Sequence, residues 1–295
     1  RVMRMDRAWF PAKVCRRDDK TGLWPCEELA AAPAAASVQP ARTTFVAGND
    51  KRANQIAASL VLVTFDMPFS VAGITERNYH GTGVIVDAER GLVVVDRNTV
   101  PVAAGDVRLT FGGSIEVPGK VEYVHPLHNL SVVSFDPIAL DGTPIRAVKF
   151  DTRELEPGEP VTAVGLGGDS RLRTLATYVA TMDDVNFPLS RTLQFRDANL
   201  EVVSLVNSPS DFDGVITGKD GRVRALWSSF ATEGARDTVQ INRGMPASVV
   251  LEAVAAARDD KPLYSLETEF EALPIAAARK LGLPAEWVEK LEQRN

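Results

Sequence analysis

Few side chains in this sequence could take part in acid–base or nucleophilic chemistry, and they fall in two stretches. Three histidines could act as a general base near neutral pH: His80, His125 and His128. Two serines and two aspartates follow closely on one another further along: Ser208, Ser210, Asp211 and Asp213. A serine becomes a nucleophile only beside a base. Serine chemistry would therefore need one of these histidines about 3 Å from a serine hydroxyl.

Metal and disulfide chemistry have less support. The two cysteines, Cys15 and Cys26, form no CxxC motif and no cluster with histidines, so we expect no metal site and no cofactor. Asp211 and Asp213 could offer oxygen ligands to Ca²⁺ or Mg²⁺, but two carboxylates separated by one residue are more typical of a solvated turn. A Cys15–Cys26 disulfide would form in an oxidising compartment, and two unpaired thiols in a reducing one are the favoured alternative.

The overall composition is that of a globular protein without an excess of positive charge. Its 295 residues are 45% hydrophobic, enough for one large domain and a smaller piece. The formal net charge of −6 argues against nucleic acid as the main partner. The apolar run at 56–65 is shorter than the roughly 20 residues of a membrane helix. The chain begins at Arg1 without an apolar signal core, which predicts a processed chain or a fragment and leaves the compartment open.

Residues 43–244 have the pattern of a β-rich domain. Short β-branched runs alternate with turn sequences such as Gly112-Gly113 and Asp141-Gly142. Seven of these runs are predicted strands: Gly83–Val86, Gly91–Val95, Val107–Phe111, Val121–Val124, Ser131–Phe135, Val161–Gly165 and Val223–Trp227. About a dozen short strands with no helices between them predict a sandwich or a pair of barrels.

The flanking regions differ in composition. Strand-like runs at 2–5 and 9–14 precede an Ala/Pro-rich stretch at 29–42, which predicts a linker. After the β-rich body, the residue pattern predicts one helix, a strand-like run and two short helices, at 245–258, 262–270, 275–281 and 286–291.

Residues 81–100 carry the most specific motif. They read GTGVIVDAERGLVVVDRNTV, in which Gly81 and Gly83 allow strands to pack closely at a barrel corner. The segment resembles the opening of the first barrel in HtrA/Deg serine proteases, G-[ST]-G-[VF]-[IV]-[IV]-D followed by a turn and G-[YL]-[IV]-[LV]-T-N-x-H-V. In that family the second strand leads into the loop that presents the catalytic histidine.

Two further segments resemble the same family. Residues 125–136, HPLHNLSVVSFD, are similar to the segment with the catalytic aspartate, and residues 157–168 to the start of the second barrel. The resemblance covers 44–258 and is closest to the second, degenerate protease domain of Deg7/Nma111-type proteins. It implies an all-β fold, a trypsin-like double β-barrel of two six-stranded antiparallel barrels, with a C-terminal helix and a partial PDZ-like tail.

Domain boundaries follow from the composition and the resemblance together. We expect the tail of a preceding module at 1–28, a linker at 29–42, a degenerate protease domain at 43–258 and the start of a PDZ-like domain at 259–295. Within the protease domain the expected order is a first barrel, a second barrel and a helix, at about 43–145, 146–244 and 245–258.

On the simplest alignment all three triad positions have lost their chemistry. Asn98 falls on the histidine, and its amide is not a base near pH 7. Asn129 falls on the aspartate and would orient an imidazole in the wrong tautomer. Asp211 or Phe212 falls on the serine, and the Gly-rich turn that forms the oxyanion hole is replaced. The resemblance therefore implies a degenerate triad with no catalytic residue.

The other polar residues have structural interpretations. His125 and His128 are predicted to be partly exposed loop histidines at the barrel edge, and His80 a residue of the incoming strand. Ser208 and Ser210 are expected to form turns. Phe212 could fill the vestigial active-site cleft.

The leading functional hypothesis is a catalytically inactive domain that acts as a structural, oligomerisation or regulatory module of a larger Deg-type protease. HtrA-like proteases are commonly trimers, and the resemblance places their contact at Phe45–Asp66, where an exposed apolar patch would support it. Partners would be proteins or peptides, with no nucleic acid and no membrane. The alternatives are an active serine endopeptidase with a misaligned triad and a peptide-binding or chaperone-like module.

Overall fold

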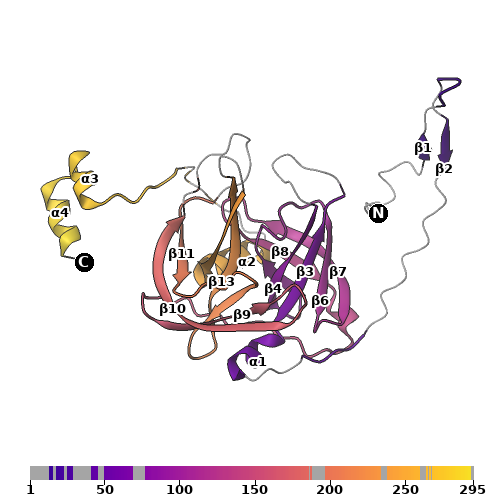
Figure 1. Cartoon of the computed structure of the whole chain (residues 1–295), viewed down its shortest axis with the longest axis horizontal. Coiled ribbons are helices and arrows are strands. Elements are labelled where there is room, and N and C mark those ends of the chain that lie inside the picture. The colour runs from indigo at the N-terminus through magenta and orange to yellow at the C-terminus, as the bar shows by residue number, and fades with distance from the viewer. Residues whose placement is uncertain are drawn as a thin grey trace.

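The computed structural model of this chain contains two closed β-barrels that lie side by side (Figure 1). Each barrel has six strands, all in antiparallel pairs. The structure describes these residues: 13–15, 18–22, 25–28, 41–45, 50–68, 77–185, 187, 197–233, 238–259, 264, 266 and 268–293. None of the helices within these ranges is long and apolar enough to cross a membrane.

Barrel 1 closes in the order β3-β4-β5-β8-β7-β6. Its strands are β3 (Leu60–Asp66), β4 (Asn78–Asp87), β5 (Leu92–Val95), β6 (Asp106–Phe111), β7 (Ile115–Val124) and β8 (Ser131–Phe135). Alternate residues point inward, as on β6, where Val107, Leu109 and Phe111 are buried between partly exposed neighbours. Gly83 on β4 leaves room for the side chains of Val63 and Val93, which a Cβ would overlap.

Barrel 2 closes in the order β10-β11-β14-β13-β12-β9. Its strands are β9 (Pro160–Leu166), β10 (Leu172–Val185), β11 (Leu200–Leu205), β12 (Asp213–Thr217), β13 (Val223–Glu233) and β14 (Thr238–Pro246). Trp227 of β13 is fully buried, and its indole N–H donates to the carbonyl of Pro209 at 3.2 Å.

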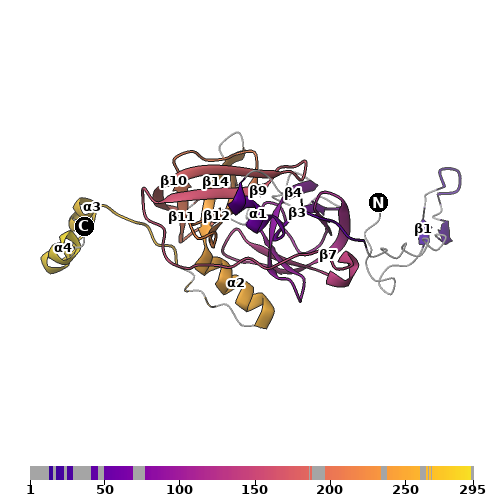
Figure 2. The ribbon, with the colours of Figure 1, turned by 90° about the horizontal axis from the view of Figure 1, so that it is seen from below.

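A shared apolar core joins the two barrels. It includes Val84 and Val132 of barrel 1 and Val164 and Val215 of barrel 2. Two helices add to it: α1 (Lys51–Ala57) contributes Ala53 and Ile56, and α2 (Ala247–Asp259) contributes Val250, Ala253 and Val254. Figure 2 shows α2 on the outside of the barrels. This common core holds the barrels in one fixed arrangement.

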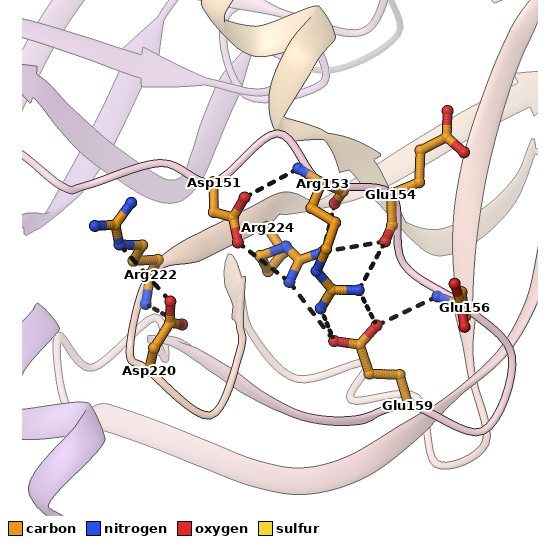
Figure 3. A network of polar contacts seen from close by, with 8 residues as sticks. All are labelled: Asp151, Arg153, Glu154, Glu156, Glu159, Asp220, Arg222 and Arg224. Atoms are coloured by element: carbon orange, nitrogen blue, oxygen red, sulfur yellow. Dashed lines mark hydrogen bonds and ion pairs between the residues drawn. The ribbon is translucent and has the colours of Figure 1, made fainter.

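The segment that connects the barrels is tied to barrel 2 by a buried arginine (Figure 3). The Arg224 side chain on β13 is only 2% exposed, and its guanidinium lies 3.4 Å from a carboxylate oxygen of Asp151 and 3.6 Å from one of Glu159. It also donates to the carbonyls of Arg153 and Glu154, the latter at 3.1 Å. Residues 151–159 are therefore fixed against the strand that also lines the junction between the barrels.

The remaining elements are short. Strands β1 (Lys13–Cys15) and β2 (Cys26–Glu28) pair with Cys15 opposite Cys26, and a 3₁₀ helix, η1 (Pro137–Leu140), follows β8. Helices α3 (Ile275–Lys280) and α4 (Ala285–Glu292) lie apart from the barrels (Figure 1). The amide of Asn199 bonds the carbonyl of Thr268 and the N–H of Phe270, which attaches the segment before α3 to barrel 2.

The predicted fold class is confirmed: the chain forms two six-stranded antiparallel barrels with a C-terminal helix. All seven predicted strands and the helices near 245–258, 275–281 and 286–291 are present, although Pro246 ends β14 and does not begin the helix. The strand-like run at 262–270 is wrong for its described residues, 264, 266 and 268–270, which form no strand. The run at 2–5, residues 9–12 of the next run and residues 29–40 of the linker lie outside the described residues, and the domain boundaries stay a prediction.

Candidate functional site

The two asparagines expected at the histidine and aspartate positions meet at the junction of the barrels. Asn98 lies in the turn after β5, and Asn129 lies just before β8. Their side-chain amides both donate to the backbone carbonyl of Ser229 on β13, at 2.8 and 2.7 Å. The Asn98 amide also lies 3.1 Å from the Ser229 hydroxyl. Two positions from barrel 1 therefore converge on one carbonyl of barrel 2.

The contacts of Asn129 require an amide and disfavour a carboxylate. Its side-chain oxygen accepts from the N–H of Arg97 at 3.0 Å, while its NH₂ group faces the Ser229 carbonyl. Its own backbone N–H donates to Asp197 at 2.8 Å. Asn129 is 1% exposed. An aspartate here would place an oxygen against the Ser229 carbonyl oxygen with no donor between them, a costly arrangement in a buried site.

Asp96 completes the contacts of Ser229. One carboxyl oxygen accepts from the N–H of Thr99 at 2.7 Å, and the other accepts from the N–H of Ser229 at 3.3 Å. The N–H and the carbonyl of Ser229 are thus both bonded by side chains of barrel 1. Gly81 is required beside them, because a Cβ at that position would overlap the Thr99 hydroxyl.

The residues expected at the nucleophile position carry no nucleophile. Asp211 is exposed, whereas Phe212 is 7% exposed and packs with Ile216 and Trp227 in the core of barrel 2. The Phe212 ring lies so close to Gly165 that a Cβ there would be 2.6 Å from its Cδ2. Phe212 therefore fills the interior of barrel 2, and the expectation that it fills the cleft is wrong.

The nearby serines have structural contacts. The Ser208 hydroxyl donates to the carbonyl of Leu205 at 3.1 Å, as expected for a turn. Ser210 is exposed in the same turn. Across the described part of the chain, no histidine forms a hydrogen bond with a serine. Within the described ranges, the arrangement therefore shows no base–nucleophile pair of the kind that covalent serine chemistry uses.

The chain has relatives among known proteins. No protein-family model matches the chain. Over its whole length the chain is 32% identical to a PDZ domain-containing protein of Schizosaccharomyces pombe, C23G3.12c, and 31% identical to the pro-apoptotic serine protease nma111 of Aspergillus oryzae. Its homologues are Nma111-type serine proteases of the HtrA family. The chain spans 30% of the length of each of these two relatives.

Solved structures share the fold at low sequence identity. A variant of the HtrA-type protease AlgW with a tripeptide has a TM-score of 0.54 and 14% identity, covering 79% of this chain and 72% of its own. The active form of the Rv3671c protease from M. tuberculosis has a TM-score of 0.53 and 14% identity, covering 80% and 96%. The trypsin-like double barrel of the HtrA family is therefore the fold of this chain.

Two of the three histidines of this double barrel, His125 and His128, are used in packing. His125 is 3% exposed, so the expectation of partial exposure is wrong for it. Its Nδ1 accepts from the N–H groups of Leu127 and His128, and its ring stacks on that of His128 with centroids 4.8 Å apart. Burial, then the charges of His128 and Arg97, lowers the pKa of His125 to about 4. His80 is exposed on β4, the incoming strand, as expected.

Sequence reasoning missed the carboxyl groups at the junction of this HtrA-type fold. Asp213 was expected in a solvated turn but begins β12, where its carboxyl accepts from the Asn242 amide at 3.3 Å. Burial, and then the charge of Asp96, raises the pKa of Asp213 to about 8, and burial raises that of Asp197 to about 7. No group of three or more metal-ligating side chains occurs in the described ranges.

Proposed function

We propose that this chain is a catalytically inactive HtrA-type domain that serves as a structural or regulatory module of a larger Deg-type serine protease. The supporting observation is that Asn98 and Asn129, at the expected histidine and aspartate positions, both bond the carbonyl of Ser229. Neither amide can take a proton from a nucleophile near pH 7. Without a triad, the residual catalysis of this fold is small.

The same contacts favour a structural role over peptide binding in the vestigial active-site cleft. The N–H of Ser229 is bonded to Asp96, and its carbonyl accepts from two amides. A peptide that added to β13 at this point would have to displace these buried contacts. Each unmade hydrogen bond of this kind costs about 1–3 kcal/mol. The polar groups of the junction thus serve to join the barrels.

A homo-oligomer is the second part of the proposal and rests on the family resemblance. Within 45–66, the described residues carry no exposed large hydrophobic side chain. The exposed ones in the described C-terminal part of the chain include Tyr264, Leu266 and Leu281. The supporting apolar patch at Phe45–Asp66 is therefore not found among these residues. The mass of the chain in solution, measured by light scattering, tests whether it is a trimer.

A fluorophosphonate probe for serine hydrolases tests the loss of catalysis directly. We expect no labelling of this chain and no cleavage of casein, with an active Deg-type protease as the positive control. A heat-denatured sample of the chain sets the background. Stoichiometric labelling would overturn the proposal, and the mass of the labelled peptide would identify the serine that acts as the nucleophile.

A further inference from the structure

Two carboxyl groups, one from each barrel, lie near each other at the junction. Asp96 follows β5 of barrel 1, is 3% exposed and accepts from the N–H of Ser229. Asp213 begins β12 of barrel 2 and accepts from the amide of Asn242. Asn242 is the residue of β14 paired with Ser229 in the register of β13 and β14. A Cβ added at Gly81 would lie 3.2 Å from the Thr99 Cβ and 3.3 Å from the Asp213 Oδ2, so the Asp213 carboxyl lies close to the turn that holds Asp96.

Among the residues that the structure describes, no cation neutralises this pair. The donors to Asp96 are the N–H groups of Thr99 and Ser229, and the donor to Asp213 is the Asn242 amide. No described lysine, arginine or histidine forms an ion pair with either carboxyl.

The charged groups on the neighbouring elements have other contacts. The guanidinium of Arg97 donates to the carbonyls of His125 and Pro101, and that of Arg243 donates to the carbonyl of Asn242. On β4, the ring of His80 lies beside Gly168. The carboxyl of Asp197 accepts the backbone N–H of Asn129. The described part of the junction therefore holds more acid than base near Ser229.

Asp96 is buried and Asp213 is partly buried. Two neighbouring carboxyls in such a site without a cation are not both ionised at neutral pH, because each charge is desolvated and the two repel. Burial raises the pKa of Asp96, and burial together with the charge of Asp96 raises the pKa of Asp213 to about 8. At neutral pH the pair keeps one proton that the same groups would release in the unfolded chain.

We propose that Asp96 and Asp213 share a single proton that helps to close the junction between the barrels, so that alkaline solution loosens it. Losing the proton places two negative charges on opposite barrels, and their repulsion acts across the junction. Contacts that do not titrate remain, such as those of the Thr82 hydroxyl with the N–H and carbonyl of Leu166. The junction would therefore loosen without the barrels unfolding. This property is independent of whether the domain is catalytic.

The sign of the effect follows from proton counts. Between about pH 4 and pH 8 the folded chain binds one more proton at Asp213 than the unfolded chain, so its stability falls as the pH rises through this window and then levels off. Asp197 acts in the same direction up to about pH 7. Asp197 is present in every variant compared, so a difference between the wild type and Asp213→Asn from pH 7 to pH 9 reports the pair.

The test compares urea unfolding of the full chain at pH 7 and pH 9 for the wild type, Asp213→Asn and the control Asp211→Asn. Asp211 is exposed two residues away, so its variant should lose as much stability as the wild type. We expect Asp213→Asn to lose less and to be the more stable protein at pH 9. Equal losses in the wild type and Asp213→Asn would overturn the proposal.

Hydrogen exchange by mass spectrometry then locates the effect. After correction for the intrinsic pH dependence of exchange, we expect protection at 96–100 and 213–229 to fall between pH 7 and pH 9 while β6 and β7 stay protected. A uniform fall over both barrels would contradict a local effect at the junction. If Asp213→Asn does not fold, Asp96→Asn removes the repelling charge instead. We expect it to move the loss of stability to lower pH, and an unchanged pH profile would refute the shared proton.

Discussion

The side-chain amide of Asn129 donates to the backbone carbonyl of Ser229 across the boundary of the two barrels, at 2.7 Å. In a working triad the corresponding carboxylate would orient a histidine. Here the amide joins the barrels, and its oxygen is bonded in turn by the N–H of Arg97. The residue type at this position is therefore matched to a carbonyl on one side and an N–H on the other.

Asn129→Asp should destabilise the fold by about 2–4 kcal/mol at pH 8, because it places a buried carboxylate oxygen against the Ser229 carbonyl. Urea unfolding monitored by circular dichroism measures the change. Asn207→Asp is the matched control, since Asn207 is exposed and should change stability by less than about 0.5 kcal/mol. Equal losses of stability for the two substitutions would show that the Asn129 amide does not contribute to the stability of the fold.

Placing triad residues at the expected positions should not produce activity. The variant Asn98→His, Asn129→Asp, Phe212→Ser supplies a base, an orienting carboxylate and a hydroxyl on the expected alignment. Phe212 lies in the core of barrel 2, so its truncation leaves a cavity that costs about 3–5 kcal/mol. The introduced hydroxyl would also lie in the interior of barrel 2, where Phe212 packs.

We therefore expect the triple variant to remain unlabelled by fluorophosphonate at neutral pH. The double variant Asn98→His, Asn129→Asp, which keeps Phe212, controls for folding by its circular dichroism spectrum. If a folded triple variant were labelled at the hydroxyl introduced in place of Phe212, the turn before β12 could still present a nucleophile.

The sequence predicted the strands that position this site because their patterns are local. In residues 81–100, two glycines, two β-branched runs and a turn are enough to indicate β4, β5 and the turn with Asn98. The place of Asn129 just before β8 follows in the same way from the run Ser131–Phe135. Asn98 therefore follows β5 and Asn129 precedes β8, while their correspondence to triad positions stays a prediction.

Elements defined by tertiary contacts were missed. Strand β10 has exposed polar residues along much of its length, so its pattern is weak, and it is held by pairing with β9 and β11. Helix α1 has seven residues, too few to be stable alone, and depends on burying Ala53 and Ile56. The burial of His125 and the inward carboxyl of Asp213 likewise depend on residues distant in the chain.

Arg224→Met should destabilise the fold by about 2–4 kcal/mol, since it leaves Asp151, Glu159 and two carbonyls without their shared donor. Arg222→Met is the control: this side chain is 56% exposed and pairs only loosely with Asp220, at 3.7 Å. Its expected effect is below about 0.5 kcal/mol. Urea midpoints at pH 7 distinguish the two variants. If Arg224→Met were as stable as the wild type, the segment 151–159 would be held by other contacts.

His125 should make the fold sensitive to acid. Its pKa of about 4 in the folded chain lies below the usual 6.5, so its contribution to stability is complete above pH 6.5 and is lost as the pH falls through 4. Asn at this position can accept the same N–H groups of Leu127 and His128 without binding a proton. Between pH 6.5 and 4, we therefore expect the wild type to lose up to about 3 kcal/mol more stability than His125→Asn.

The junction carboxyls gain protons over the same range, so the difference between the proteins is the informative quantity, measured as the shift of the urea midpoint. His80→Asn, at an exposed position of β4, should follow the wild type. Parallel pH profiles of the wild type and His125→Asn would show that the His125 ring accepts a proton without disturbing the loop.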